Sequence, residues 1–401
     1  MEKRLKESSG GEARFTPTVD LENSAERIWD VVVVGAGPAG AMASYQLARR
    51  GASVLLVERS SFPRPKVCGS CLNAAAVNLL EAEGLGEILA GNGASPLEEL
   101  VLIAKKARAR ISLVGGVVLS REIFDAGLVE NSVREGTHFL SQTHATLENK
   151  IEPTFRRLNL RQGAKEVSVK VRVVLSADGL GGQLLEKETG FEMRTSIASR
   201  VGVGKIVAEA PPFYRSGKIY MACGPGGYLG LVRLEDGRLN LAAAFDPAFL
   251  KASGGAGPAV RRTLEENNLP AIEDLGEPWQ GTFPLTRRRL RVAGYRIFVI
   301  GDSAGYVEPF TGEGIALALA SGKEVAEWVL EGVRAWTPGL AVRWTKLHRQ
   351  RVSRQNFCRF AANILRKKTL THAIVHILSR APRLAAPFVE RVSAPAPLGD
   401  D

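Results

Sequence analysis

The strongest hydrophobic pattern in the chain is a pair of short apolar runs joined by a glycine-rich turn and a helical stretch. Val31–Val34 is wholly β-branched, as expected for a strand that is buried on both faces. The turn Gly35–Gly40 reads GAGPAG, the residues after it predict a helix that ends at Gly51, and a second apolar run, Val54–Val57, is followed by Glu58. Strand, turn, helix and strand in this order predict the first βαβ unit of a parallel sheet.

Further segments of the chain extend this pattern. Val167–Leu175 and Arg296–Ile300 are apolar runs of the same kind, and we expect them in the same parallel sheet. The predicted helices cover Asn73–Leu89, a segment that starts at the N-cap residue Ser120, and a segment from Thr311–Gly314 to about Glu331.

Alternating, glycine-punctuated runs between residues 190 and 285 predict an antiparallel sheet instead. Two shorter runs, Leu100–Ile103 and Ile111–Leu113, alternate in the same way, and Glu235–Arg238 has the composition of a hairpin turn. The main runs are Ile197–Ile206, Lys218–Ala222, Tyr228–Arg233 and Leu239–Phe245.

These patterns predict a mixed α/β fold with a Rossmann-like lobe (a parallel sheet with helices), a second lobe built on an antiparallel β-sheet, and a C-terminal helical tail. Because the strands of the parallel sheet are scattered along the chain, we expect the first lobe to be assembled from three segments. The expected division is a flexible extension (1–25), parts of the first lobe (26–90, 120–189 and 286–335), parts of the second lobe (91–119 and 190–285) and the helical tail (336–401).

Composition narrows the class of protein. At 401 residues, 45% of them hydrophobic, the chain is long enough for two lobes with substantial cores. It contains no apolar run near the roughly 18 residues of a membrane-spanning helix, so we expect none. The polar N-terminal stretch lacks the hydrophobic region of a signal peptide, which predicts a cytoplasmic protein with reduced cysteines.

The net charge of +11 is concentrated in the C-terminal tail. Residues 334–391 contain 13 Lys and Arg against one acid, so the rest of the chain is close to neutral. Apolar residues recur at helical spacing from Phe357 to Leu365, which predicts an amphipathic helix with a basic face. Two interpretations stay open: a helix packed on the protein with its basic face in solvent, or an element that associates peripherally with the inner membrane surface. Nucleic acid is not an expected partner, because no motif for it accompanies the charge.

The glycine turn has the pattern GxGxxG that binds the pyrophosphate of a dinucleotide. Gly35 makes the tight turn, Gly37 lets the backbone approach the phosphates, and Gly40 lets the helix pack closely on its strand. The N-terminus of the helix offers free N–H groups and the positive end of its dipole. Glu58 is placed to accept hydrogen bonds from ribose hydroxyls.

Cys68 and Cys71 form a Cys-x-x-Cys pair in a proline-interrupted loop after Glu58. A zinc site needs four ligands, and the other cysteines, Cys223 and Cys358, are distant in the sequence, so we expect no metal site. The remaining interpretations are a redox-active disulfide and, as the preferred one, two reduced thiols in a loop that passes the nucleotide.

Five further motifs follow the glycine turn in a fixed order. They are Arg59 with the loop Phe62–Gly69, the helix start Arg121–Asp125, the Asp-Gly pair at Asp178, the Gly-Asp pair at Gly301–Asp302, and Val307–Ile315, which reads VEPFTGEGI. In this order they resemble the motifs of FAD-dependent oxidoreductases with the p-hydroxybenzoate hydroxylase fold, and most closely the geranylgeranyl reductase branch. The resemblance spans about residues 30–335 and implies that the first lobe binds FAD and the second binds the substrate.

The resemblance also implies roles for single residues. Asp302 is expected to accept a hydrogen bond from a ribityl hydroxyl, and Arg121 to contact a phosphate instead of pairing with a neighbouring acid. Cys68 is expected to face the flavin ring and to donate a proton, while Tyr228 and Arg233 are expected to contact the substrate. The complete set of residues expected to bind FAD is Gly35, Gly37, Pro38, Ala39, Gly40, Glu58, Arg59, Lys66, Cys68, Gly69, Arg121, Ala145, Asp178, Gly301, Asp302, Pro309, Gly312, Gly314 and Ile315.

The reaction that the resemblance implies is hydride transfer between the flavin and a C=C or C–C unit of an apolar, lipid-like substrate such as an isoprenoid or a polyketide. NAD(P)H or another reductant would act as a transient electron donor, because no second GxGxxG unit of the same kind is present. Two alternatives stay open. One is a monooxygenase that hydroxylates its substrate through a C4a-hydroperoxide, and the other is a non-catalytic, flavin-bound membrane partner.

Overall fold

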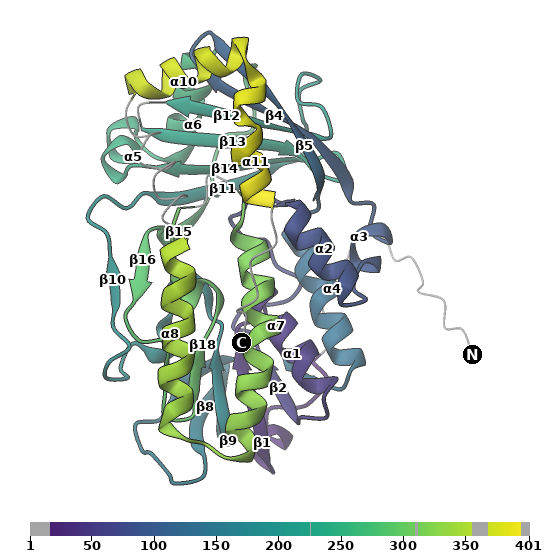
Figure 1. Cartoon of the computed structure of the whole chain (residues 1–401), viewed down its shortest axis with the longest axis vertical. Helices are drawn as coiled ribbons and strands as arrows, with labels where there is room; N and C mark the ends of the chain where they lie inside the picture. The colour runs from purple at the N-terminus through teal and green to yellow at the C-terminus, as the bar shows by residue number, and fades with distance from the viewer. Residues whose placement is uncertain (1–16, 225, 309–311, 355–367, 394–401) are drawn as a thin grey trace.

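The computed structural model describes residues 17–224, 226–308, 312–354 and 368–393 of the chain (Figure 1). In Figure 1 a mixed sheet with a parallel centre and its helices fill the lower half of the molecule, and a second large sheet crosses the upper half. The fold class predicted from the hydrophobic pattern is therefore confirmed.

The lower sheet is built around β1 (Ile28–Val34), in which Val31, Val32 and Val33 are completely buried. β1 pairs in parallel with β2 (Val54–Val57) and β9 (Lys165–Ser176), and β18 (Ile297–Val299) pairs in parallel with β9. A strand that is covered on both faces has no face for polar residues, which explains the continuous β-branched runs. The sheet also contains β6 (His138–Leu140), β7 (His144–Leu147), β8 (Arg156–Gln162) and β17 (Ala293–Gly294).

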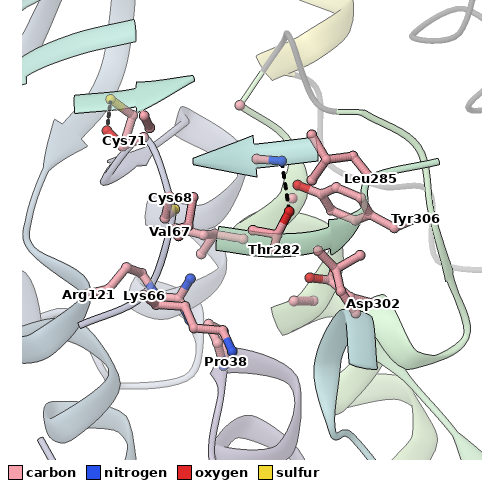
Figure 2. A pocket seen from close by; sticks show the side chains of 18 of the residues that line it. Pro38, Lys66, Val67, Cys68, Cys71, Arg121, Thr282, Leu285, Asp302 and Tyr306 are labelled. Atoms are coloured by element: carbon pink, nitrogen blue, oxygen red, sulfur yellow. Dashed lines mark hydrogen bonds between the residues drawn. The ribbon is translucent and has the colours of Figure 1, made fainter. Parts of the chain in front are cut away.

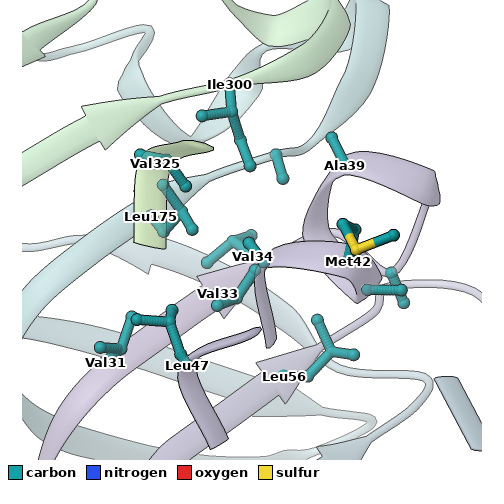
Figure 3. Close-up of a cluster of buried hydrophobic side chains, with 14 of the residues drawn as sticks. Val31, Val33, Val34, Ala39, Met42, Leu47, Leu56, Leu175, Ile300 and Val325 are labelled. Atoms are coloured by element: carbon teal, nitrogen blue, oxygen red, sulfur yellow. The ribbon is translucent and has the colours of Figure 1, made fainter. Parts of the chain in front are cut away.

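Helices α1 (Pro38–Ala48) and α7 (Gly314–Arg334) pack against each other and against this sheet (Figure 3). Met42 and Val325 of these helices share one hydrophobic cluster with Val33 of β1. The helices approach most tightly at Gly322, where a Cβ atom would lie 2.3 Å from the carbonyl oxygen of Ala39. Small residues therefore set the distance between α7 and the glycine turn.

The other elements cover the sheets or connect them. The helices are α2 (Ala74–Ala82), α3 (Glu87–Ala90), α4 (Arg121–Arg134), α5 (Pro247–Ser253) and α6 (Ala256–Glu266). A small sheet consists of β10 (Met193–Thr195), β16 (Arg287–Arg289) and β19 (Gly305–Tyr306). Short 3-10 turns are η1 (Asn23–Ala25), η2 (Gly179–Gly181), η3 (Gln183–Leu185) and η4 (Gly301–Ser303).

The upper sheet has the strand order β15-β11-β14-β13-β12-β4-β5-β3. Neighbouring strands are antiparallel, except that β12 and β4 run in parallel. The predicted hairpin turn at Glu235–Arg238 joins β13 to β14. The strands are β3 (Cys71–Leu72), β4 (Ser95–Ala104), β5 (Ala107–Val118), β11 (Val201–Val207), β12 (Lys218–Gly224), β13 (Gly227–Arg233), β14 (Leu239–Phe245) and β15 (Gln280–Pro284).

The two faces of the upper sheet have different surroundings. Leu231 and Leu241 point to one face and share a hydrophobic cluster with Leu264 of α6. The alternate residues Gly230 and Ala242 point the opposite way, because side chains alternate along a strand, and they line a cavity between the lobes. The side that carries α6 is therefore closed by packing, and the other side is left for a ligand.

Two predicted elements differ from the structure. The helix expected over Asn73–Leu89 is divided into α2 and α3, because Gly84 adopts a positive φ of 76° and ends the first helix. The strand expected from Ile197 begins only at Val201, and Ile197 is fully exposed. In both cases the apolar spacing continues past the point where the helix or strand ends, and hydrophobic periodicity does not detect that point.

The C-terminal tail contains α8 (Pro338–Arg354), α10 (Lys368–Arg380), η5 (Pro382–Ala385) and α11 (Ala386–Ser393). Trp344 of α8 is buried, and its indole N–H donates to the carbonyl oxygen of Val299 at 3.3 Å, which holds α8 on the lower sheet. The predicted stripe from Phe357 to Leu365 lies outside the described residues, so membrane association through it stays a prediction. Among the described segments, no helix is long and apolar enough to span a bilayer.

Gly322→Ala is expected to lower the free energy of unfolding by about 1–3 kcal/mol, because the added methyl group would push α1 and α7 apart. Urea denaturation followed by circular dichroism measures the change. Gly339→Ala in α8 is the matched control, since within the described structure its Cβ atom would have only Thr337 Oγ1 within 4 Å, at 3.7 Å. Equal losses in the two variants would contradict the explanation from close packing.

Candidate cofactor and substrate site

The turn between β1 and α1 brings backbone segments so close that two side chains are excluded. Gly35 has a φ of 108°, and a Cβ atom there would lie 2.3 Å from the carbonyl oxygen of Ala177, directly after β9. A Cβ atom at Gly40 would lie 1.9 Å from the carbonyl oxygen of Gly35. Gly37 is different, because the nearest atom to its Cβ position is 4.0 Å away, on Arg64. Gly35 and Gly40 therefore serve packing, whereas Gly37 opens the N-terminus of α1 to a ligand.

Glu58 follows β2 and lies beside this turn, where it is 6% exposed. Its carboxylate accepts hydrogen bonds from the backbone N–H groups of Ala36 and Ser60, both at 3.1 Å, and from Nη2 of Arg64 at 3.0 Å. Burial raises the pKa of the carboxyl, but the charge of Arg64 and these hydrogen bonds outweigh burial, so the pKa lies below its ordinary value. Glu58 is therefore held as an anion at the end of β2.

Arg64 is a residue of the site that sequence reasoning did not identify. Its Nη1 donates to Oδ2 of Asp125 at 2.9 Å, and Asp125 accepts two further hydrogen bonds from Arg121, each at 2.8 Å. Glu58, Arg64, Asp125 and Arg121 thus form one buried chain of alternating charge. The position of Arg64 between Pro63 and Pro65 is the signal in the sequence, because prolines on both sides restrict the loop that carries it.

Arg121 lies in the cavity wall, as expected of a residue that reaches a bound ligand. Its guanidinium is paired with Asp125 through two hydrogen bonds, the pairing that the resemblance disfavoured. Burial lowers the pKa of Arg121, but the Asp125 carboxylate outweighs burial and raises it. Contact between Arg121 and a phosphate is not tested by the structure and stays a prediction.

Asp178 joins the Asp-Gly and Gly-Asp motifs to each other. Its Oδ1 accepts hydrogen bonds from the hydroxyls of Ser176 and Ser303 at 2.8 Å, and its Oδ2 accepts one from the backbone N–H of Leu184 at 2.9 Å. Asp178 also borders the cavity. Because both oxygens already have protein partners, its clearest role in the structure is to hold η4 beside the end of β9.

Asp302 in η4 faces the cavity from the side opposite to Lys66 and Arg121, with Tyr306 next to it (Figure 2). Within the described structure its carboxylate has no hydrogen-bond partner, which leaves it open to a ligand. Burial raises the pKa of Asp302 to about 6, although the charges of Arg121 and Lys66 oppose this rise. Partial desolvation, followed by the positive charges of Arg64 and Arg121, lowers the pKa of the Lys66 ammonium.

These residues surround one cavity of about 1050 Å³, at the upper end of the range of about 300–1,000 Å³ for ligand sites. It extends from the glycine turn to the free face of the upper sheet. The predicted residues that line it are Gly35, Gly37, Pro38, Ala39, Glu58, Arg59, Lys66, Cys68, Gly69, Arg121, Ala145, Asp178, Tyr228, Asp302, Gly312, Gly314 and Ile315.

The remaining predicted residues are placed elsewhere. Gly40 packs inside the turn. Gly301 packs on Ala39, because a Cβ atom added at Gly301 would lie 2.8 Å from the Cβ atom of Ala39. Arg233 does not line the cavity, because its guanidinium donates to the carbonyl oxygens of Tyr214 and Ala210 at 2.9 and 3.0 Å. The sequence assigns Arg233 to the substrate because it lies in the same run as Tyr228. Side chains alternate along a strand, so Tyr228 and Arg233, five residues apart, point to opposite faces. Pro309 lies outside the described residues.

Tyr228 of β13 reaches the cavity above a buried ion pair. Nη1 of Arg200 lies 2.8 Å from Oε1 of Glu308, and both side chains are 1% exposed. The Arg200 guanidinium lies 5.7 Å from the centre of the Tyr228 ring. Burial, followed by the negative charge of Glu308, raises the pKa of the Tyr228 phenol well above its ordinary value. The phenol therefore stays protonated at the cavity surface.

The residues of the cavity fit FAD. The open backbone at Gly37 and the N-terminus of α1 suit a pyrophosphate, and the free carboxylate of Asp302 suits a hydroxyl group. Gly312 and Gly314, at the N-terminus of α7, leave space for a flat ring because they carry no side chains. Space for a second, apolar molecule continues along the upper sheet.

Arg64→Met is expected to lower the free energy of unfolding by about 3–5 kcal/mol at neutral pH, since Glu58 and Asp125 would keep their burial and lose a shared cation. In the wild type the pKa of Glu58 is lowered, so its ionised carboxylate stabilises the folded state at neutral pH. This stabilisation is lost only when the pH falls through the lowered pKa. Without Arg64, burial raises the pKa of Glu58, so the folded variant takes up a proton and recovers stability as the pH is lowered from about 7 to 5.

Urea denaturation at several pH values measures this difference between Arg64→Met and the wild type. Arg59→Met is the matched control, because Arg59 also borders the cavity but donates to the side-chain oxygen of Gln183 at 3.0 Å. A loss for Arg64→Met that does not depend on pH would rule out the electrostatic explanation.

Comparison with known sequences supports the same cofactor. A digeranylgeranylglycerophospholipid reductase from Methanococcus vannielii is 29% identical over 315 residues, which cover 74% of this chain and 75% of that protein. Residues 29–334 match the protein family described as the FAD binding domain.

Known structures share the fold. A flavoprotein/dehydrogenase from Cytophaga hutchinsonii superimposes with a TM-score of 0.74 at 17% identity, covering 92% of this chain and 96% of the other. The p-nitrophenol 4-monooxygenase from Pseudomonas putida has a TM-score of 0.71 at 14% identity, covering 92% and 98%. The resemblance inferred from the motifs is confirmed, and the chain belongs to the FAD binding domain family as an FAD-dependent oxidoreductase.

Proposed function

We propose that this protein reduces a C=C bond of an apolar, lipid-like substrate. The observation that carries the proposal is that one cavity joins the glycine turn to the hydrophobic face of the upper sheet. Polar and charged groups lie at the end near the glycine turn, and aliphatic side chains line the face of the sheet. A polar cofactor and an apolar substrate would therefore meet where these two parts join.

Bound FAD would supply the hydride, after reduction by NAD(P)H or another reductant. The chain itself offers groups for the proton that must reach the second carbon. Tyr228 and Tyr306 line the cavity, and their phenols carry a proton at neutral pH, as tyrosine does at its ordinary pKa. Cys68 also borders the cavity and stays our predicted alternative donor. Water would return the proton to the donor after each turnover.

The name of the relative from Methanococcus vannielii supports reduction of an isoprenoid lipid. The second candidate is hydroxylation, which is supported by the shared fold of the p-nitrophenol 4-monooxygenase. The two reactions differ in their use of oxygen, because a hydroxylase transfers an oxygen atom to its product and a reductase does not.

Asp302→Ala is expected to remove most of the FAD from the purified protein, because the variant loses the free carboxylate that suits a hydroxyl group of the cofactor. Absorbance of the flavin relative to protein measures the bound fraction. Glu313→Ala is the control, since Glu313 is a nearby carboxylate at the N-cap of α7 that is not among the described residues lining the cavity. Full occupancy of Asp302→Ala by FAD would contradict the assignment of this residue.

Product analysis tests the reaction. The FAD-loaded protein is incubated with geranylgeraniol and a reductant, once without oxygen and once under ¹⁸O₂, and the products are identified by mass spectrometry. We expect addition of two hydrogen atoms per reduced double bond without oxygen, and no ¹⁸O in the product. Incorporation of ¹⁸O would instead establish the hydroxylase.

A further inference from the structure

The C-terminal helices form a wall of the cavity beside the upper sheet. Ile374 and Leu378 of α10, together with Phe388 of α11, line the cavity. Ile374 and Leu378 are four residues apart and so lie on one face of α10. Ile377 of the same helix does not line the cavity and is 52% exposed. The apolar face of α10 is thus directed into the cavity.

Contacts with the sheet fix α10 in this position. Val375 is completely buried and shares a hydrophobic cluster with Leu102 of β4 and Ala109 of β5. Nδ1 of His372 lies 3.3 Å from the carbonyl oxygen of Ala104, at the end of β4. In Figure 1 α10 crosses the end of the upper sheet, and α11 runs down from it toward the lower lobe. The helix is therefore an integral part of the cavity wall.

Three residues of the upper sheet, two of them small, form another wall. Gly230 of β13 pairs with Ala242 of β14 on one side and with Met221 of β12 on the other, and all three residues line the cavity. At Gly230 a Cβ atom would find its nearest neighbour at 3.4 Å, so there is room for a side chain that points into the cavity. The small side chains leave a shallow trough across the sheet.

The wall made by α10 and α11 lies beyond the part of the chain that matches the FAD binding domain, which ends at residue 334. The residues named on these two walls are apolar, so they offer contact area without side-chain hydrogen bonds. Such a space suits a hydrocarbon chain, because burial of methylene groups stabilises the complex in proportion to the apolar area removed from water.

We propose that the space between α10 and the trough at Gly230 and Ala242 binds the hydrocarbon chain of the substrate, and that Ile374 limits the length of chain accepted. The inference rests on the proposed function for the class of substrate. It adds the location of the chain and a determinant of specificity in the C-terminal tail.

The test compares Ile374→Trp with Ile377→Trp in the full-length, FAD-loaded protein. The two substitutions are chemically identical and lie three residues apart on one helix, but only the first fills the cavity. The probe is cis-parinaric acid, whose long polyene chain fluoresces in apolar sites, and medium- and long-chain fatty acids compete with it. We expect Ile374→Trp to bind the probe about tenfold more weakly or worse, with long competitors affected more than medium ones. Ile377→Trp should bind as the wild type does.

FAD content and circular dichroism confirm that each variant is folded. Gly230→Leu fills the trough from the wall made by the sheet and should weaken binding of the probe in the same way, so the proposal is tested even if Ile374→Trp does not fold. Equal affinities in Ile374→Trp, Gly230→Leu and the wild type would overturn the proposal. An effect of Ile377→Trp alone would overturn it as well, and would assign α10 to an outer surface. Binding of the probe needs no turnover. The binding test can therefore succeed or fail independently of the product analysis that tests the proposed reaction.

Discussion

The site depends on a close contact among three backbone segments: the turn after β1, the end of β9 and helix α7. Side chains are excluded at Gly35 and Gly40, where Cβ atoms would lie 2.3 and 1.9 Å from carbonyl oxygens, and at Gly322, where the distance to Ala39 would be 2.3 Å. This contact positions the N-terminus of α1 and the N-terminus of α7 at the same edge of the parallel sheet. Both helix ends then face one cavity, which suits the negatively charged parts of FAD.

Buried charges hold the loops around this edge. Arg64 links Glu58 at the end of β2 to Asp125 of α4, while Asp178 links the end of β9 to Ser303 of η4. Each link costs desolvation, and each is supported by several hydrogen bonds, which is the condition under which buried charges are tolerated. The carboxylate of Asp302 differs because it faces the cavity without a partner in the described structure, and its pKa is raised to about 6. An unpaired acid among paired ones marks the place where a ligand completes the site.

The upper sheet gives the cavity its second, apolar half. One face packs on α6, and the other carries the trough at Gly230 and Ala242. Helix α10 borders the same cavity, so the C-terminal tail takes part in the site although it lies beyond the residues that match the FAD binding domain. A cofactor site made by the lower lobe and a substrate site bounded by the tail would allow related proteins to keep the flavin chemistry while the substrate changes.

The sequence by itself determined the parallel sheet, the glycine turn and the order of the FAD motifs, because local periodicity and glycine spacing record backbone geometry directly. It also predicted the mixed α/β fold, and most of the residues that it assigned to the FAD site line the cavity. The tertiary structure alone decided the direction of side chains and the partners of charged groups. Arg233 points away from the cavity, Arg64 bridges two acids distant in the sequence, and the apolar face of α10 meets the upper sheet. The two acids that Arg64 bridges are far apart in the sequence, and so are α10 and the strands that it meets, so no local pattern records these contacts.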